Sequence, residues 1–159
     1  MDISYPKRKP LRIPNYDYSQ CNIYFLTLCT KDRQHLFWSV EATCGRPQMN
    51  LSLAGRLVAV ELEQIPQIYK SVRIETYCIM PDHIHLLLSI DADAEGRPQV
   101  APTVSRVVQQ FKGAVSKKIG QPIWQKSFYD HIVRNEADYL ACWQYIENNP
   151  LKYEVKSCL

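Results

Sequence analysis

Two histidines separated by one residue, His83 and His85, have the spacing of paired metal ligands. They lie at the start of a mainly apolar segment, 83–88, that directly follows Pro81 and Asp82, a pair typical of turns. Alternate side chains of an extended strand share one face, so both imidazoles are expected on the same side, with Cα atoms about 7 Å apart. The pattern predicts a strand that offers two ligands to one divalent ion. The competing interpretation is a strand with two half-exposed polar residues.

A second pair of polar side chains lies near the carboxyl end of the sequence. Apolar periodicity predicts a helix from Glu136 toward Pro150, and Tyr145 and Asn149 lie one turn apart on it. A tyrosine at the edge of an apolar helix face is ordinarily structural, and an asparagine before proline ordinarily ends a helix. These two residues matter for chemistry only in combination with the histidines.

The segments that must position these residues alternate between strand and helix patterns. Pro66 is expected to end the first helix, while Thr103 and Gly120 have the residue types that begin and end the second. The histidine strand and the strand before it are expected to form a hairpin, and a loop is expected after the first strand. The predicted strands cover 22–28, 72–80, 83–90 and 128–134, and the predicted helices cover 52–64, 103–119 and 136–150.

Length and composition indicate one globular domain over residues 1–159. The chain has 159 residues, of which 46% are hydrophobic, which is enough to form a core. Residues 1–19 are interpreted as a basic arm and 91–102 as a solvated loop. No apolar run approaches the roughly 18 residues that span a bilayer, so we expect a cytoplasmic protein that does not contact membranes. The six cysteines form no Cys-x-x-Cys pair, which argues against a zinc knuckle or a disulfide framework.

The net charge of +3 is too small to indicate a nucleic-acid-binding protein by itself. The basic residues are unevenly distributed, however, with one cluster in the arm and another on the polar side of the second helix. If they bind phosphates, DNA affinity should fall steeply as salt rises. The candidate DNA contacts are Lys7, Arg8, Lys9, Arg12, Arg106, Lys112, Lys117, Lys118 and Arg134.

Several separated motifs, in the same order along the chain, together resemble a known family. They are Tyr-x-Ile-Met-Pro-Asp-His-Ile-His at 77–85, Phe-Lys at 111–112, Trp-Gln followed by Phe-Tyr-Asp-His-Ile-Val-Arg within 124–134, and Tyr-Ile-Glu-Asn-Asn-Pro at 145–150. With the arm motif that begins at Pro14, the chain resembles the REP-associated tyrosine transposases. These belong to the single-tyrosine branch of the HUH (His-hydrophobe-His) transposases and nucleases. The resemblance extends to Lys152.

The resemblance implies an α+β, ferredoxin-like fold, with helices packed on a mainly antiparallel sheet. It also implies cleavage and rejoining of single-stranded DNA. His83 and His85 match the metal-binding pair by position, and Tyr145 matches the nucleophile that becomes linked to a 5′ phosphate. Asn149 falls where related insertion-sequence enzymes place a glutamine ligand, and Asn148 is an adjacent alternative. His131 has a counterpart in the family but no role that the sequence indicates.

The same resemblance favours Mg²⁺ or Mn²⁺ as the cofactor, although two histidines also suit Zn²⁺. The expected partner is single-stranded DNA that carries REP-like hairpins, bound by a monomer or a homodimer. A domesticated protein that binds DNA hairpins without cleaving them, or a repressor, is the main alternative. The histidine-triad nucleotide hydrolases are disfavoured, because Leu87 stands where their third histidine is required.

Overall fold

The computed structural model describes residues 22–41, 48–91 and 102–157. The predicted basic arm, with Lys7, Arg8, Lys9 and Arg12, lies outside the described residues, as does most of the loop at 91–102. The strands are β1 (Asn22–Cys29), β2 (Trp38–Glu41), β3 (Gln48–Leu51), β4 (Val72–Ile79), β5 (His83–Ile90) and β6 (Tyr129–Ile132). The helices are α1 (Leu53–Ile68), α2 (Val104–Ile119) and α3 (Glu136–Ser157).

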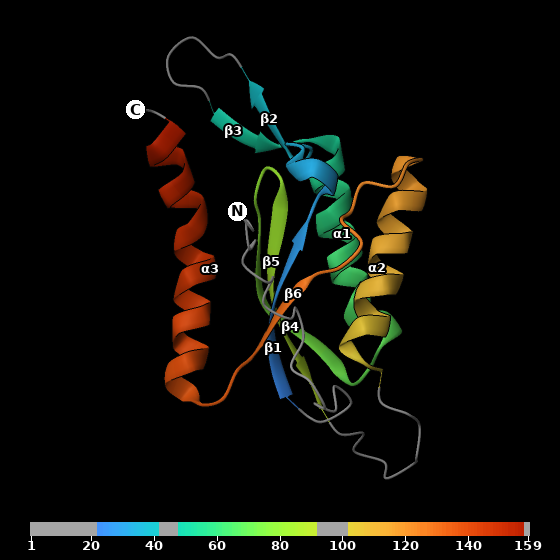
Figure 1. Cartoon of the computed structure of the whole chain (residues 1–159), viewed down its shortest axis with the longest axis vertical. Helices are drawn as coiled ribbons and strands as arrows, with labels where there is room; N and C mark the ends of the chain where they lie inside the picture. The colour runs from blue at the N-terminus through green and yellow to red at the C-terminus, as the bar shows by residue number, and fades with distance from the viewer. Residues whose placement is uncertain (1–21, 42–47, 92–101, 158–159) are drawn as a thin grey trace, which may run out of the picture.

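The main sheet has four antiparallel strands in the order β4-β5-β1-β6 (Figure 1). Apart from the β2-β3 hairpin, the chain runs β1-α1-β4-β5-α2-β6, which is the βαββαβ arrangement of ferredoxin-like folds. The predicted α+β class is therefore confirmed. This topology places the histidine strand β5 in the middle of the sheet, between β4 and β1.

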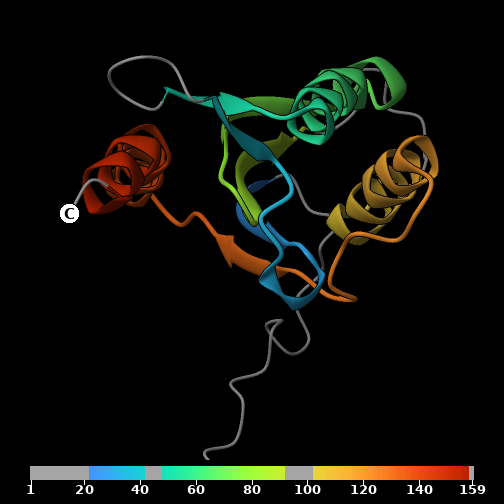
Figure 2. The same cartoon turned by 90° about the horizontal axis from the view of Figure 1, so that it is seen from above.

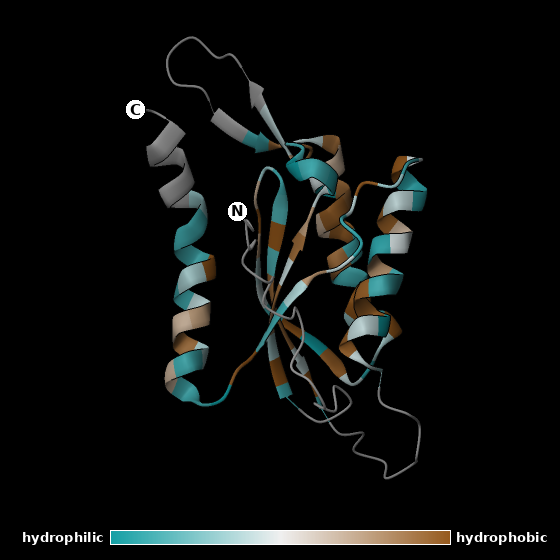
Figure 3. Ribbon diagram, in the orientation of Figure 1, coloured by the Kyte–Doolittle hydropathy of each residue, from teal (hydrophilic) through white to brown (hydrophobic). Residues whose placement is uncertain are grey.

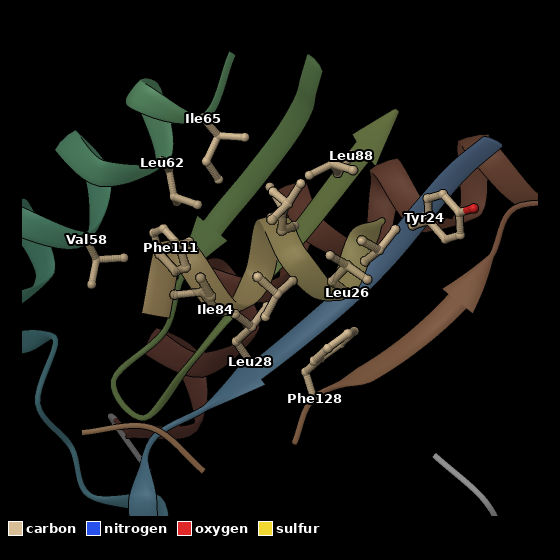
Figure 4. Close-up of a cluster of buried hydrophobic side chains, with 14 of the residues drawn as sticks. Tyr24, Leu26, Leu28, Val58, Leu62, Ile65, Ile84, Leu88, Phe111 and Phe128 are labelled. Atoms are coloured by element: carbon tan, nitrogen blue, oxygen red, sulfur yellow. The ribbon is translucent and has the colours of Figure 1, made fainter. Parts of the chain in front are cut away.

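Alternating residues of β1 and β5 form the main core. Tyr24, Leu26 and Leu28 are fully buried on one face of β1, and the even-numbered residues of β5 are their direct cross-strand partners. Figure 4 shows these side chains with Leu62 of α1 and Phe111 of α2, which belong to the same core cluster. Figure 3 agrees with this position of the core, since hydrophobic residues are frequent in the central strands and in α1. The odd-numbered residues of β5, including both histidines, consequently point to the opposite face.

Side-chain caps begin both helices of the core layer. The Ser52 hydroxyl accepts a hydrogen bond from the backbone N–H of Gly55 (3.1 Å), and the Thr103 hydroxyl accepts one from the N–H of Arg106 (3.3 Å). At the end of α2, Gly120 adopts a positive φ of 86°, which glycine tolerates without a steric penalty. The predicted start and end of the second helix are therefore confirmed.

Of the described helices, α3 is the one that packs on the other face of the sheet, as the view in Figure 2 shows. A second, smaller cluster of buried residues joins this helix to the sheet: Cys78, Met80, Leu87 and Ile146, with Tyr139, Cys142 and Trp143 packed against them. The buried face of α3 thus meets the side of the sheet that carries the histidines.

Two predicted helix ends are wrong, and both involve proline. The helix α1 continues through Pro66 to Ile68, and α3 continues through Pro150 to Ser157. Proline removes its own N–H donor, but its fixed φ is compatible with a helix. Each helix therefore tolerates the loss of one backbone hydrogen bond.

The β2-β3 hairpin is a further departure, because it occupies a segment predicted to be a loop. It is joined to the main sheet by Trp38, whose indole N–H donates a hydrogen bond to the backbone oxygen of Ile79 (2.7 Å). Among the described residues, none of the helices combines the length and the apolar character that crossing a membrane requires.

Candidate active site

The two histidines among the predicted metal ligands lie on the face of β5 that α3 covers. In the antiparallel pairing of β1 with β5, His85 lies opposite Thr27 and His83 lies opposite Cys29. The two Nε2 atoms face each other at 3.1 Å. Two nitrogen ligands about 2.1 Å from one ion lie about 3 Å apart when the angle at the ion is near 90°. The separation of the two Nε2 atoms therefore matches that of two ligands on one divalent cation.

The other ring nitrogen of each histidine has its own hydrogen-bond partner. Nδ1 of His83 lies 2.5 Å from Oδ1 of Asp82, and Nδ1 of His85 lies 2.9 Å from the hydroxyl of Thr27. A carboxylate can only accept, so Nδ1 of His83 carries a proton, and Nε2 is the atom of this ring placed to bind a metal. The Thr27 hydroxyl can donate or accept and therefore suits either tautomer of His85. Such outer partners are what orient histidines that bind metals.

The Asp82 carboxylate is itself held by an arginine. Nε of Arg33 lies 2.9 Å from Oδ2 of Asp82, and the arginine side chain is half exposed. Arg33 belongs to a single 3₁₀ turn, Lys31–Arg33, that follows β1, and both Asp32 and Arg33 have positive φ angles of 55° and 56°. The turn thus brings a permanent positive charge to the edge of the site.

The environment of His85 keeps its imidazole neutral. The pKa of His85 is lowered to about 3, chiefly because burial disfavours the charged form and also because His83 and Arg33 lie nearby; Asp82 acts in the opposite direction. At neutral pH the ring therefore carries no charge. A neutral imidazole is the form that donates a lone pair to a metal ion.

The helix α3 brings Tyr145 beside this pair. Its ring lies edge-on to the His85 ring with centroids 5.1 Å apart, and edge-on to Phe25 at 5.8 Å. The side chain is 50% exposed, so the phenol combines a fixed ring with access to solvent. The next residue, Ile146, is 1% exposed and anchors this turn of the helix in the smaller cluster.

The two asparagines that compete as a third ligand differ in their surroundings. Asn148 is exposed, and its amide donates a hydrogen bond to the backbone oxygen of Gln144 (2.8 Å). Asn149 is half-buried, one turn beyond Tyr145. The structure thus brings the imidazoles and the phenol together, and Asn149 remains a prediction.

A cleft of about 270 Å³ opens beside the tyrosine. It is lined by Phe25, Tyr129, His131, Ala141, Cys142 and Tyr145. Within it, Nε2 of His131 lies 2.9 Å from both carboxylate oxygens of Asp138, and this hydrogen bond is the largest cause of the lowered pKa of Asp138. His131, for which the sequence indicates no role, therefore belongs to the surroundings of Tyr145.

The predicted DNA contacts of α2 lie in a different layer from the imidazoles. Because α2 packs on the opposite face of the sheet from α3 (Figure 2), its basic side chains are across the sheet from Tyr145. Arg106 and Lys117 are exposed, and Lys118 forms an ion pair with Glu61 of α1.

The last two candidates, Lys112 and Arg134, differ in whether their side chains already have hydrogen-bond partners within the fold. The ammonium of Lys112 donates to the backbone oxygens of Gln125 and Ser127, each at 2.9 Å, and burial lowers the pKa of Lys112 to about 8. Arg134 is exposed and directly precedes Asn135 at the start of α3. Of the described candidates, Arg134 is thus in the segment that leads into the tyrosine helix.

Sequence reasoning missed Thr27 and Arg33. Thr27 could have been found by pairing the first strand with the histidine strand, since antiparallel pairing sets residues directly opposite one another. Arg33 offered no such signal, because its contact with Asp82 depends on the shape of an irregular turn.

Comparisons with known proteins identify the family of this chain. A family model described as "Transposase IS200 like" matches residues 18–149, so the chain belongs to the IS200-like transposase family. An uncharacterized protein of Haemophilus influenzae is 31% identical over 166 residues, covering 92% of this chain and 90% of the relative.

Within that family, the similarity extends to the REP-associated tyrosine transposases. One from Escherichia coli K12 is 30% identical over 80 residues, which is 50% of this chain and 45% of that protein. A solved structure of a REP-associated tyrosine transposase bound to a REP hairpin superposes with a TM-score of 0.65 at 19% identity, covering 89% of this chain and 74% of that one. The fold and the resemblance predicted from the motifs are thereby confirmed, and they support a DNA transposase or nuclease role.

Proposed function

We propose that this protein cleaves and rejoins single-stranded DNA through a covalent bond between Tyr145 and a 5′ phosphate. The observation that carries the proposal is the contact between the phenol ring of Tyr145 and His85, whose Nε2 in turn faces that of His83. A half-exposed nucleophile thus lies beside a ready pair of metal ligands. Phosphoryl transfer needs both an in-line nucleophile and neutralisation of charge on the phosphate.

In the cleavage step, the Tyr145 oxygen forms a bond to phosphorus and the bond from phosphorus to the 3′ oxygen breaks. The phenol loses its proton, and the departing 3′ oxygen gains one. Because one phosphodiester replaces another, the free 3′ hydroxyl can reverse the attack and join strands without an external energy source. The packed ring of Tyr145 limits the positions of the attacking oxygen, which favours such a reaction.

A divalent cation, Mg²⁺ or Mn²⁺, would neutralise charge on the phosphate when bound. His83 and His85 would hold it, with Asn149 as the proposed third ligand. Asp82 and Thr27 orient the two imidazoles through their Nδ1 atoms. Arg33 adds a guanidinium at the same edge, where it can pair with a phosphate oxygen as well as with Asp82.

The substrate we propose is single-stranded DNA with a hairpin, the class of ligand bound in the similar structure. Exposed basic residues would contact its phosphates, and Arg134 is the candidate that adjoins the tyrosine helix. The remaining candidates are the arm residues and those of α2. If several of these contacts form, a plot of log affinity against log salt should be steep.

The test is incubation of the protein with single-stranded hairpin DNA and Mn²⁺, followed by a denaturing gel. We expect a covalent protein-DNA band with the wild type and none with Tyr145→Phe. Tyr129→Phe is the matched control, because Tyr129 lines the same cleft, is 52% exposed and should keep the band. A band that survives Tyr145→Phe refutes the assignment. Tight binding with no band across metals and hairpins would instead favour a non-cleaving hairpin-binding protein or repressor.

A further inference from the structure

A second cluster of metal-binding side chains lies between β6 and α3. It consists of His131 on the strand and of Asp138 and Cys142, one turn apart on the helix. Their donor atoms all lie within 4.8 Å of one another. Nε2 of His131 is 2.9 Å from both Asp138 oxygens, and Sγ of Cys142 is 4.0 Å from Oδ1 of Asp138.

These distances are close to those of a coordinated ion. Nitrogen, oxygen and sulfur ligands lie about 2.0–2.3 Å from Zn²⁺, which puts tetrahedral neighbours roughly 3.3–3.8 Å apart. The observed 2.9 Å and 4.0 Å fall a few tenths of an ångström on either side of that range. The third pair, His131 and Cys142, is within 4.8 Å, so side-chain rotations would have to bring the three donors to coordination distance from one cation.

We infer that His131, Asp138 and Cys142 form a Zn²⁺-binding site distinct from the His83 and His85 pair. The combination of imidazole, carboxylate and thiolate suits Zn²⁺ or a similar thiophilic ion and does not suit Mg²⁺. Binding releases the thiol proton, because the thiolate is the ligand.

The fold already holds the carboxylate in place. Asp138 accepts a hydrogen bond from the backbone N–H of Arg134 (3.0 Å), and its own N–H donates to the side chain of Asn135 (2.9 Å). Those contacts cap the start of the helix, so the position of Asp138 beside His131 has an explanation without any metal. They do not require a thiol, so Cys142 is the residue whose contribution distinguishes a metal site from a helix cap.

The site would have one open coordination position. Three protein ligands leave the fourth place of a tetrahedral ion for water or another ligand. His131 and Cys142 both line the cleft that Tyr145 also borders, so the site would adjoin the same cleft as the proposed nucleophile. An ion here would also link β6 to the helix that carries Tyr145.

The experiment uses Co²⁺ as a spectroscopic probe in the reduced full-length protein. We expect near-ultraviolet charge-transfer absorption, typical of cobalt-thiolate bonding, to saturate near one equivalent and to disappear when Zn²⁺ is added. Cys142→Ser should abolish it, and His131→Ala should weaken Co²⁺ binding by about tenfold or more. Circular dichroism of both variants checks that the fold is intact.

Cys29→Ser is the matched control. Cys29 lies opposite His83 in the strand pairing and, unlike the buried Cys78 opposite His85, is partly exposed, so it is the more accessible of the two described cysteines placed to report an ion at the first site. We expect this variant, and the double variant His83→Ala with His85→Ala, to keep the absorption. Absorption that is absent from the wild type, that survives Cys142→Ser, or that is lost in Cys29→Ser overturns the inference. None of these readouts depends on DNA cleavage, so the inference stands or falls separately from the proposed function.

Discussion

Replacing Asp82 by asparagine tests whether the hydrogen bond behind His83 tunes the metal site. The side chains of Asp82 and His83 are only 13% and 16% exposed, so solvent screens their interaction weakly. Asparagine keeps the shape and one acceptor oxygen but loses the charge, both toward Nδ1 of His83 and toward Arg33.

The size of the effect follows from the loss of charge. A hydrogen bond to a charged group contributes about 1.5–3 kcal/mol, against about 0.5–1.5 kcal/mol for a neutral one, so the change removes about 1–1.5 kcal/mol. One factor of ten in affinity corresponds to about 1.4 kcal/mol. We therefore expect Asp82→Asn to weaken Mn²⁺ binding about tenfold, at the lower end of the roughly 10–100-fold range for such outer partners.

The assay is a Mn²⁺ titration followed by electron paramagnetic resonance, which detects the free ion. Asp91→Asn is the matched control, because Asp91 also pairs with an arginine, Arg73 (2.7 Å), but the side chains of Asp91 and Arg73 are 48% and 65% exposed. Its Mn²⁺ affinity should stay within about twofold of the wild type. Equal Mn²⁺ affinity for Asp82→Asn and the wild type, or equal losses in both variants, would refute the reasoning.

Three further predictions concern the fold. Gly55→Ala should lower the urea midpoint of unfolding, because a Cβ there would clash with the backbone oxygen of Phe37. Gly113→Ala should instead raise the urea midpoint, because this exposed position inside α2 has open space for a methyl group. The expected gain in the free energy of unfolding is about 0.5–1 kcal/mol. Burial raises the pKa of the Cys78 thiol to about 11, so at pH 8 iodoacetamide should modify Cys78 more slowly than the half-buried Cys29, as measured by mass spectrometry of peptides.

Much of the scaffold follows from local sequence patterns. The two-residue alternation of β5 correctly separates His83 and His85 from Ile84 and Leu86, because successive side chains of a strand point to opposite faces of the sheet. The boundaries of α2 follow from Thr103 and the glycine at its end, whose preferences act within a few residues.

The remaining features depend on contacts between distant segments. Helical periodicity shows that Arg106 and Lys117 share a polar side of α2, but it carries no information on which face of the sheet that helix covers. The β2-β3 hairpin is likewise set by its packing, since Trp38 hydrogen-bonds to β4 some forty residues later. The pairing of Arg33 with Asp82 is of the same kind, as two separate turns create it.

The backbone at Asp32 and Arg33 has positive φ angles that these residue types disfavour, in a turn that places Arg33 beside Asp82. Left-handed geometry costs roughly 1–2 kcal/mol for each non-glycine residue, and two occur in succession in a turn that buries none of its side chains. Arg33→Gly would remove the energetic cost of the positive φ at this position, but it would also remove the guanidinium that pairs with Asp82. The protein retains the strained turn, and the ion pair of Arg33 with Asp82, which in turn contacts His83, depends on it.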